Sequence, residues 1–104
     1  MENNRKYNVI VSKRAAKMLS DHAAFLANVS RSAADELVSE FSTAASSLEF
    51  MPERCSKFNA GHLQSNKYRR LIFGKRYLMV FQIIDQTVYI DYILDCRRDY
   101  SWLI

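Results

Sequence analysis

Glycine and proline are scarce in this 104-residue chain, which contains two glycines and one proline. This composition leaves little room for flexible linkers, so a single domain over residues 1–104 is expected. Cys55 and Cys96 form no CxxC pair, and neither a metal site nor a redox motif is indicated. No apolar run approaches the ~20 residues of a membrane span, and the N-terminus lacks the apolar stretch of a signal peptide. We therefore expect a cytoplasmic protein without cofactor, bound metal or membrane association.

Acidic residues are missing from one long segment, residues 54–76, although the net charge of the whole chain is only +4. Basic and acidic side chains balance over residues 1–52. In contrast, the charged residues of the segment 54–76 are all basic: Arg54, Lys57, Lys67, Arg69, Arg70, Lys75 and Arg76. Such a segment favours an anionic partner, such as a nucleic acid or an acidic protein. A solvated basic surface is the plainer alternative.

Hydrophobic periodicity predicts a helical hairpin in the first half of the chain. Residues 7–11 are expected to form a short strand, and Ser12 to cap a helix over residues 13–27. A second helix is expected to begin near Ser32, with Ser32 and Asp35 at near capping-box spacing. Its buried stripe is predicted to contain Ala34, Leu37, Val38, Phe41, Ala45 and Leu48. The short connection between the helices makes an antiparallel hairpin the expected arrangement.

Three strands are predicted in the second half, after Pro52 and an irregular stretch over residues 53–66. They are expected over residues 68–73, 77–84 and 87–94, and tight turns should join them. The order of elements is then βααβββ. We expect an α+β fold in which the helical hairpin packs on one face of a small antiparallel sheet.

The tight turn after Ile84 pairs this residue with Thr87, and this register assigns the side chains of the last hairpin to two faces. The predicted core face carries Tyr77, Met79, Phe81, Ile83, Val88, Ile90, Tyr92 and Leu94. The opposite face carries Leu78, Val80, Gln82, Tyr89, Asp91 and Ile93. This second face is half apolar and is expected to stay uncovered, which is typical of a partner-binding surface. Either Arg69 or Arg70 must project onto it, and the sequence leaves open which.

The ordered set of segments resembles toxins of the RelE/ParE superfamily, from bacterial type II toxin–antitoxin (plasmid stabilisation) modules. The matching segments are "YNVIVSKRAAKML", "VSRSAADEL", "LEFMPER", "KYRRLIFGKRYLMVFQIIDQTVYIDYILD" and "CRRDY", which together span nearly the whole chain. The resemblance implies a small toxin that inhibits growth when free and that a cognate antitoxin binds. The antitoxin is expected to contact the second sheet face through Leu78, Val80, Tyr89 and Ile93.

Two activities occur in this superfamily. RelE-like members cut messenger RNA in the ribosomal A site, and under this alternative Arg98 and Tyr100 would be the catalytic residues. ParE-like members poison DNA gyrase by contact and cut nothing themselves. Leu78 follows Tyr77 where RelE-like members carry an arginine, which removes a cation from the strand and favours the ParE-like mode. The endoribonuclease stays the alternative, so the question whether the chain is an enzyme is open.

The residues expected to contact the target, under either activity, are Arg69, Arg70, Lys75, Arg76 and Arg97, because cations supply much of the affinity for phosphates and acidic surfaces. Neither histidine is expected to be catalytic. His22 shares a helix face with leucines, and His62 falls in the irregular loop. A non-toxic basic RNA-binding domain is a further alternative, although Tyr89 is the single sheet aromatic that we expect to be exposed for base stacking.

Overall fold

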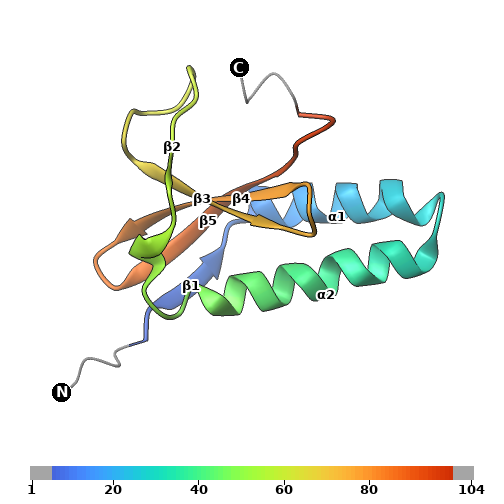
Figure 1. Cartoon of the computed structure of the whole chain (residues 1–104), viewed down its shortest axis with the longest axis horizontal. Coiled ribbons are helices and arrows are strands. Elements are labelled where there is room, and N and C mark those ends of the chain that lie inside the picture. The colour runs from blue at the N-terminus through green and yellow to red at the C-terminus, as the bar shows by residue number, and fades with distance from the viewer. Residues whose placement is uncertain (1–5, 100–104) are drawn as a thin grey trace.

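A helical hairpin packs across one face of a five-stranded sheet in the computed structural model, which describes residues 6–99 (Figure 1). The elements follow in the order β1 (Asn8–Val11), α1 (Lys13–Ala27), α2 (Arg31–Ser47), the 3₁₀ turn η1 (Pro52–Arg54), β2 (Lys57–Phe58), β3 (Tyr68–Phe73), β4 (Tyr77–Ile84) and β5 (Thr87–Asp95). The predicted α+β fold and the order of its main elements are confirmed. Neither helix of the described part is long and apolar enough to cross a membrane.

The strand order is β1-β5-β4-β3-β2, and two details of it correct the prediction. β1 runs parallel to β5, so the sheet is mixed rather than wholly antiparallel. This pairing follows because the helical hairpin returns the chain and leaves β1 beside the last strand. The short strand β2 was also missed, since it lies in a stretch that was predicted to be irregular.

Serine side chains cap both helices. The Oγ of Ser12 accepts a hydrogen bond from the backbone N–H of Ala15 at 3.0 Å, as the predicted cap requires. The Oγ of Ser30 accepts from the backbone N–H of Ala33 at 3.2 Å, so Ser30 caps α2. The predicted start near Ser32 is therefore slightly late, because Ser30 has the extended backbone of a cap and the helix begins directly after it.

The main core lies between the helical hairpin and the sheet. Its buried members include Ala15, Leu37, Phe41, Leu48, Phe73, Tyr77, Met79, Phe81, Val88, Ile90 and Ile93. Burying each large apolar side chain contributes about 1.5–3 kcal/mol, so this cluster dominates the stability of the fold. Val38 was predicted in the buried stripe of α2 but is 44% exposed, because the helix faces the sheet through the neighbouring Leu37.

A β-bulge interrupts the last hairpin. The predicted register holds from the turn as far as the pair Phe81–Ile90, and beyond it Val80 pairs with Tyr92. Asp91 is therefore an extra residue in β5. Because side chains alternate along a strand, one inserted residue exchanges the two faces for everything that follows it.

The bulge corrects the predicted faces at the end of β5. Ile93 packs in the main core with the helices, where the uninterrupted register had placed Tyr92 and Leu94. Those two residues lie on the second face of the sheet instead.

The second sheet face is not open, contrary to the prediction. β2 and the segment after it fold across this face, and Figure 1 shows that segment on the side away from α2. The residues that pack together there are Phe58, Ala60, Leu63, Tyr68, Leu78, Val80 and Leu94. Leu78 is 2% exposed, and Val80 and Ile93 are fully buried. Of the four residues expected to contact an antitoxin, Tyr89 alone keeps a partly exposed side chain. The expectation of an open face is wrong because the chain supplies its own cover, while the antitoxin contact stays a prediction.

Candidate functional site at the end of the sheet

Two aspartates fix the turn through which the chain leaves β5. Oδ1 of Asp95 accepts a hydrogen bond from the backbone N–H of Arg97 at 2.9 Å. Oδ2 of Asp99 accepts from the backbone N–H of Asp95 at 2.8 Å, and the N–H groups of Arg98 and Asp99 donate back to the Asp95 carbonyl. Asp95 is only 3% exposed, and these hydrogen bonds offset the free-energy cost of removing its polar groups from water. The turn therefore holds the backbone of both arginines in a defined position.

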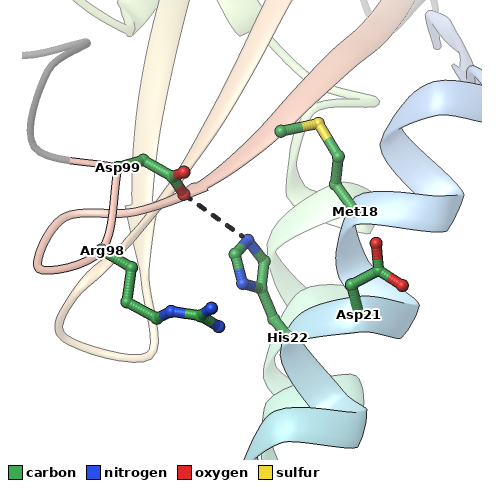
Figure 2. Close-up of a pocket in the computed structure, with 5 residues that line it drawn as sticks. All are labelled: Met18, Asp21, His22, Arg98 and Asp99. Carbon is green, nitrogen blue, oxygen red and sulfur yellow. Dashed lines mark ion pairs between the residues drawn. The ribbon is translucent and has the colours of Figure 1, made fainter.

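His22 on α1 connects the helix to this turn (Figure 2). Its Nε2 lies 2.9 Å from the carbonyl oxygen of Ile93 and 3.8 Å from Oδ2 of Asp99. The imidazole is 8% exposed, and its ring centroid lies 5.5 Å from that of Tyr77. A proton on Nε2 serves as the donor to the Ile93 carbonyl. His22 thus has the structural position that its helix face predicted.

Arg98 packs along α1 rather than across the sheet. Its guanidinium carbon lies 4.2 Å from the centre of the Phe25 ring, a cation–π contact of the kind worth about 0.5–1 kcal/mol at exposed sites. A hollow of about 230 Å³ lies between the turn and the helix. Figure 2 shows the residues that line it: Met18, Asp21, His22, Arg98 and Asp99. Asp21 pairs with Lys17 at 3.1 Å. Arg98 itself stays exposed at the mouth of this hollow.

The turn between β3 and β4 brings two more cations to the same end of the sheet. The backbone N–H of Cys96 donates to the carbonyl of Arg76 at 2.8 Å, so this turn and the turn after β5 are neighbours. The Arg76 guanidinium lies 5.5 Å from the centre of the Tyr77 ring. We name this surface the C-terminal rim, and it consists of Lys75, Arg76, Arg97 and Arg98. The fold thus collects four of the predicted functional residues.

The other two predicted cations, Arg69 and Arg70, lie on β3. Nη1 of Arg69 donates to the carbonyls of Glu53 and Cys55, at 3.0 and 2.6 Å, and so holds η1 against the sheet. Arg70 lines a hollow on the second face together with Lys57 and Cys96, so it lies near the start of the turn after β5. The structure therefore answers the question that the sequence left open, since Arg70 is the arginine that projects onto the second face.

A polar cluster that the sequence did not predict surrounds the bulge. Oδ2 of Asp91 accepts hydrogen bonds from the Tyr68 hydroxyl at 3.1 Å and from Nε2 of Gln82 at 2.7 Å. Arg14 donates through Nε to the Asp91 carbonyl and lies over the Tyr92 ring at 3.9 Å. Burial first, and then the Asp91 carboxylate, raise the pKa of Tyr68 to about 12. No pattern in the neighbouring sequence predicts this cluster, because its members come together only through the bulge.

The residues from 6 to 99 include few groups suited to catalysis. They contain no cluster of three or more His, Cys, Asp or Glu side chains that could hold a metal ion. Burial raises the pKa of the Cys55 and Cys96 thiols, which makes both weak nucleophiles. His62 lies in an exposed loop. Tyr100, predicted as a proton donor of the endoribonuclease alternative, lies outside the described residues.

Comparison with known families resolves the identity of this fold. Residues 9–100 match the model of a family described as the ParE toxin of the type II toxin–antitoxin system parDE. The chain belongs to the ParE toxin family. This assignment confirms the superfamily that the sequence resembled, and it gives the chain the role of the toxin in a toxin–antitoxin system. The match includes the whole C-terminal rim.

The ParE-like fold also has a solved counterpart. The chain is similar to a structure described as the chromosomal ParDE TA system from P. aeruginosa, with a TM-score of 0.70 and 12% sequence identity. The alignment covers 89% of this chain and 98% of the other. Similarity at this low identity concerns the fold alone. No curated protein matches the sequence.

Proposed function

We propose that this ParE-family chain inhibits growth by binding DNA gyrase, and that a cognate antitoxin neutralises it in the cytoplasm. Membership of the ParE toxin family supports both the role as a toxin and the existence of an antitoxin partner. The choice of gyrase rests on the ParE-like resemblance and on the arrangement of the cationic side chains.

The position of Arg98 and the leucine at position 78 carry the proposal. Cleavage of RNA through its 2′-hydroxyl needs a base, an acid and cations around one phosphate. Arg98 packs against α1 over Phe25, whereas Arg70 lies on the second face of the sheet. The β4 position where RelE-like members carry an arginine holds Leu78, which is 2% exposed. The guanidinium of Arg98 over Phe25 and the buried leucine at position 78 favour inhibition by contact over catalysis.

The C-terminal rim suits a protein contact. Arginine is enriched among the residues that dominate the energy of protein interfaces, and anchors held in place before binding lose less entropy on association. Arg98 is exposed and is positioned from both sides, by the aspartate turn and by the Phe25 ring.

A ribosome-dependent endoribonuclease is the second candidate, and one observation favours it. The rim gathers four basic side chains at one end of the sheet, and such a surface would also hold the phosphates of a message. Under this alternative Arg98 would stabilise the transition state, so Arg98→Ala would cost about 2.7–4 kcal/mol of activation free energy.

The proposal is tested by growth after induction of the chain, alone and together with the product of an adjacent antitoxin reading frame. Wild-type chain should stop growth, and co-expression should restore it. Arg98→Ala should abolish most of the growth inhibition in a folded protein. Lys13→Ala is the control, because Lys13 is an exposed cation at the start of α1, outside the C-terminal rim, and this variant should keep full toxicity. Normal growth at high soluble expression of the wild-type chain would contradict the toxin function.

A further inference from the structure

β1 is an edge strand of the sheet, and its outer side is open. It pairs with β5, and among residues 6–99 no strand lies on its other side. The N–H of Ser12 donates to the carbonyl of Ile90 in β5 at 2.9 Å, so this amide points into the sheet. Because backbone groups alternate along a strand, the N–H and C=O groups of Val9 and Val11 point outward.

This edge lacks the features that protect sheet edges from pairing with other chains. Asn8–Val11 contains no charged residue and no proline, and its register with β5 has no bulge. The side chain of Ile10 is 47% exposed, and that of Val11 is 37% exposed. A short, uncharged and apolar edge of this kind is suited to receive another strand.

Opposite charges lie at the two ends of β1. At its start, the carbonyl of Glu49 accepts the N–H of Tyr7 at 2.9 Å, and the Tyr7 hydroxyl donates to the carboxylate of Glu53. Lys6 pairs with Glu49 at 3.7 Å, so this end keeps a net negative charge. At the other end Lys13 is exposed and has no ion pair among residues 6–99. The two ends of the strand are therefore complementary to each other in charge.

A two-fold axis at Ile10 would satisfy the outward backbone groups of two copies at once. In this antiparallel register Val9 of each copy faces Val11 of the other, and each such pair exchanges two hydrogen bonds. Ile10 faces its own counterpart in the closer position, where the Cα atoms of opposite residues lie about 4.5 Å apart. The same register places Tyr7 of one copy opposite Lys13 of the other. The lysine then approaches the carboxylates at the start of the strand.

We propose that the free toxin self-associates through β1 as a two-fold dimer, in which the two five-stranded sheets join into one. The occupant is a second copy because backbone groups, apolar side chains and charges of this edge all complement their own symmetry mates. A short strand pair makes a small interface, and interfaces below about 1,200 Å² are weak. The dimer should therefore form in the micromolar range. No residue of the C-terminal rim belongs to β1, so the inference does not depend on the target of the toxin.

Substitutions of Ile10 test the two-fold axis directly. In sedimentation equilibrium, the mass of the purified full-length wild-type chain should rise with concentration toward twice 12.1 kDa. Ile10→Lys and Ile10→Glu each place two like charges opposite one another, so each should weaken the dimer at least about tenfold. An equimolar mixture of the two variants should restore it, because every lysine then faces a glutamate. Ile72→Lys is the matched control, since Ile72 is 56% exposed on β3 and away from β1, and it should dimerise like the wild type.

Hydrogen exchange of the wild-type chain provides a second readout if the Ile10 variants fold poorly. The amides of Val9 and Val11 should become protected as the concentration rises. A wild-type chain that stays monomeric, or a mixture that associates no better than the separate variants, would overturn the inference. The same follows if these amides become protected only on addition of the antitoxin, because the edge would then receive the antitoxin. Growth inhibition is measured separately, so failure of the toxin function and failure of the dimer are distinguishable.

Discussion

Nε2 of His22 lies 3.8 Å from Oδ2 of Asp99, and this contact joins α1 to the turn that carries Arg98. The same Asp99 oxygen accepts the backbone N–H of Asp95 at 2.8 Å. A buried residue of the first helix therefore helps to set the position of the exposed arginine near the C-terminus. Contacts within the tertiary structure therefore position this part of the C-terminal rim.

Asp99→Ala should reduce growth inhibition more than it reduces stability. Removing the carboxylate leaves the Asp95 N–H without its acceptor and releases the turn from His22, at a cost of about 1 kcal/mol in the free energy of unfolding. Arg98 then loses its fixed position. Asp21 lines the same hollow, and among residues 6–99 its carboxylate pairs only with Lys17, so Asp21→Ala should keep full toxicity. Thermal melts and growth curves of both variants are the measurement, and equal toxicity of the two would contradict the role given to the turn.

Leu78→Arg should unfold the protein rather than change its target. Leu78 is 2% exposed and packs with Phe58, Tyr68 and Leu94 on the second face. A guanidinium there would be buried without a partner, and we expect a loss of more than about 4 kcal/mol in the free energy of unfolding. Ile72→Arg on the same face is the control, because Ile72 is 56% exposed. If a circular dichroism melt of Leu78→Arg matched the wild type, the burial argument would be wrong.

Stability should fall at high pH through Tyr68. Burial and Asp91 raise its pKa to about 12, so the fold favours the protonated phenol. The contribution of a group with a raised pKa is fully present below the pKa of the unfolded chain, about 10, and is lost as the pH rises through about 12. Urea denaturation between pH 9 and 12 should therefore show a decline that is smaller in Tyr68→Phe. A Tyr89→Phe control should decline like the wild type, and an identical decline in all three proteins would argue against this assignment.

Local sequence signals were sufficient for most of the fold. Ser12 predicted the first helix correctly, and the alternation around the turn after Ile84 predicted the register of the last hairpin up to Phe81. Both signals act between residues that are close in sequence. Caps, turns and the pairs next to a turn depend on the residues themselves.

Other features were missed because the residues that form them are far apart in the sequence. The bulge at Asp91 is stabilised by Tyr68, Gln82 and Arg14, and nothing in the residues around Asp91 indicates an insertion. The cover over the second face depends on Phe58 and Leu63, which stand in a stretch rich in polar residues that was predicted to be irregular. The basic residues near the C-terminus were predicted as functional, but the contact of Arg98 with Phe25 and the contacts of Arg69 with Glu53 and Cys55 are long-range and were not visible in the sequence.

The target of the toxin is tested most directly with purified protein and DNA gyrase. A supercoiling assay titrated with the wild-type chain should show loss of supercoiling activity, and Arg98→Ala should need a concentration at least about tenfold higher. Primer extension on messages from induced cells should show no new cut sites before the DNA-damage response begins. Discrete cleavage within codons at early times, together with unaffected gyrase, would contradict the account and make this chain an endoribonuclease.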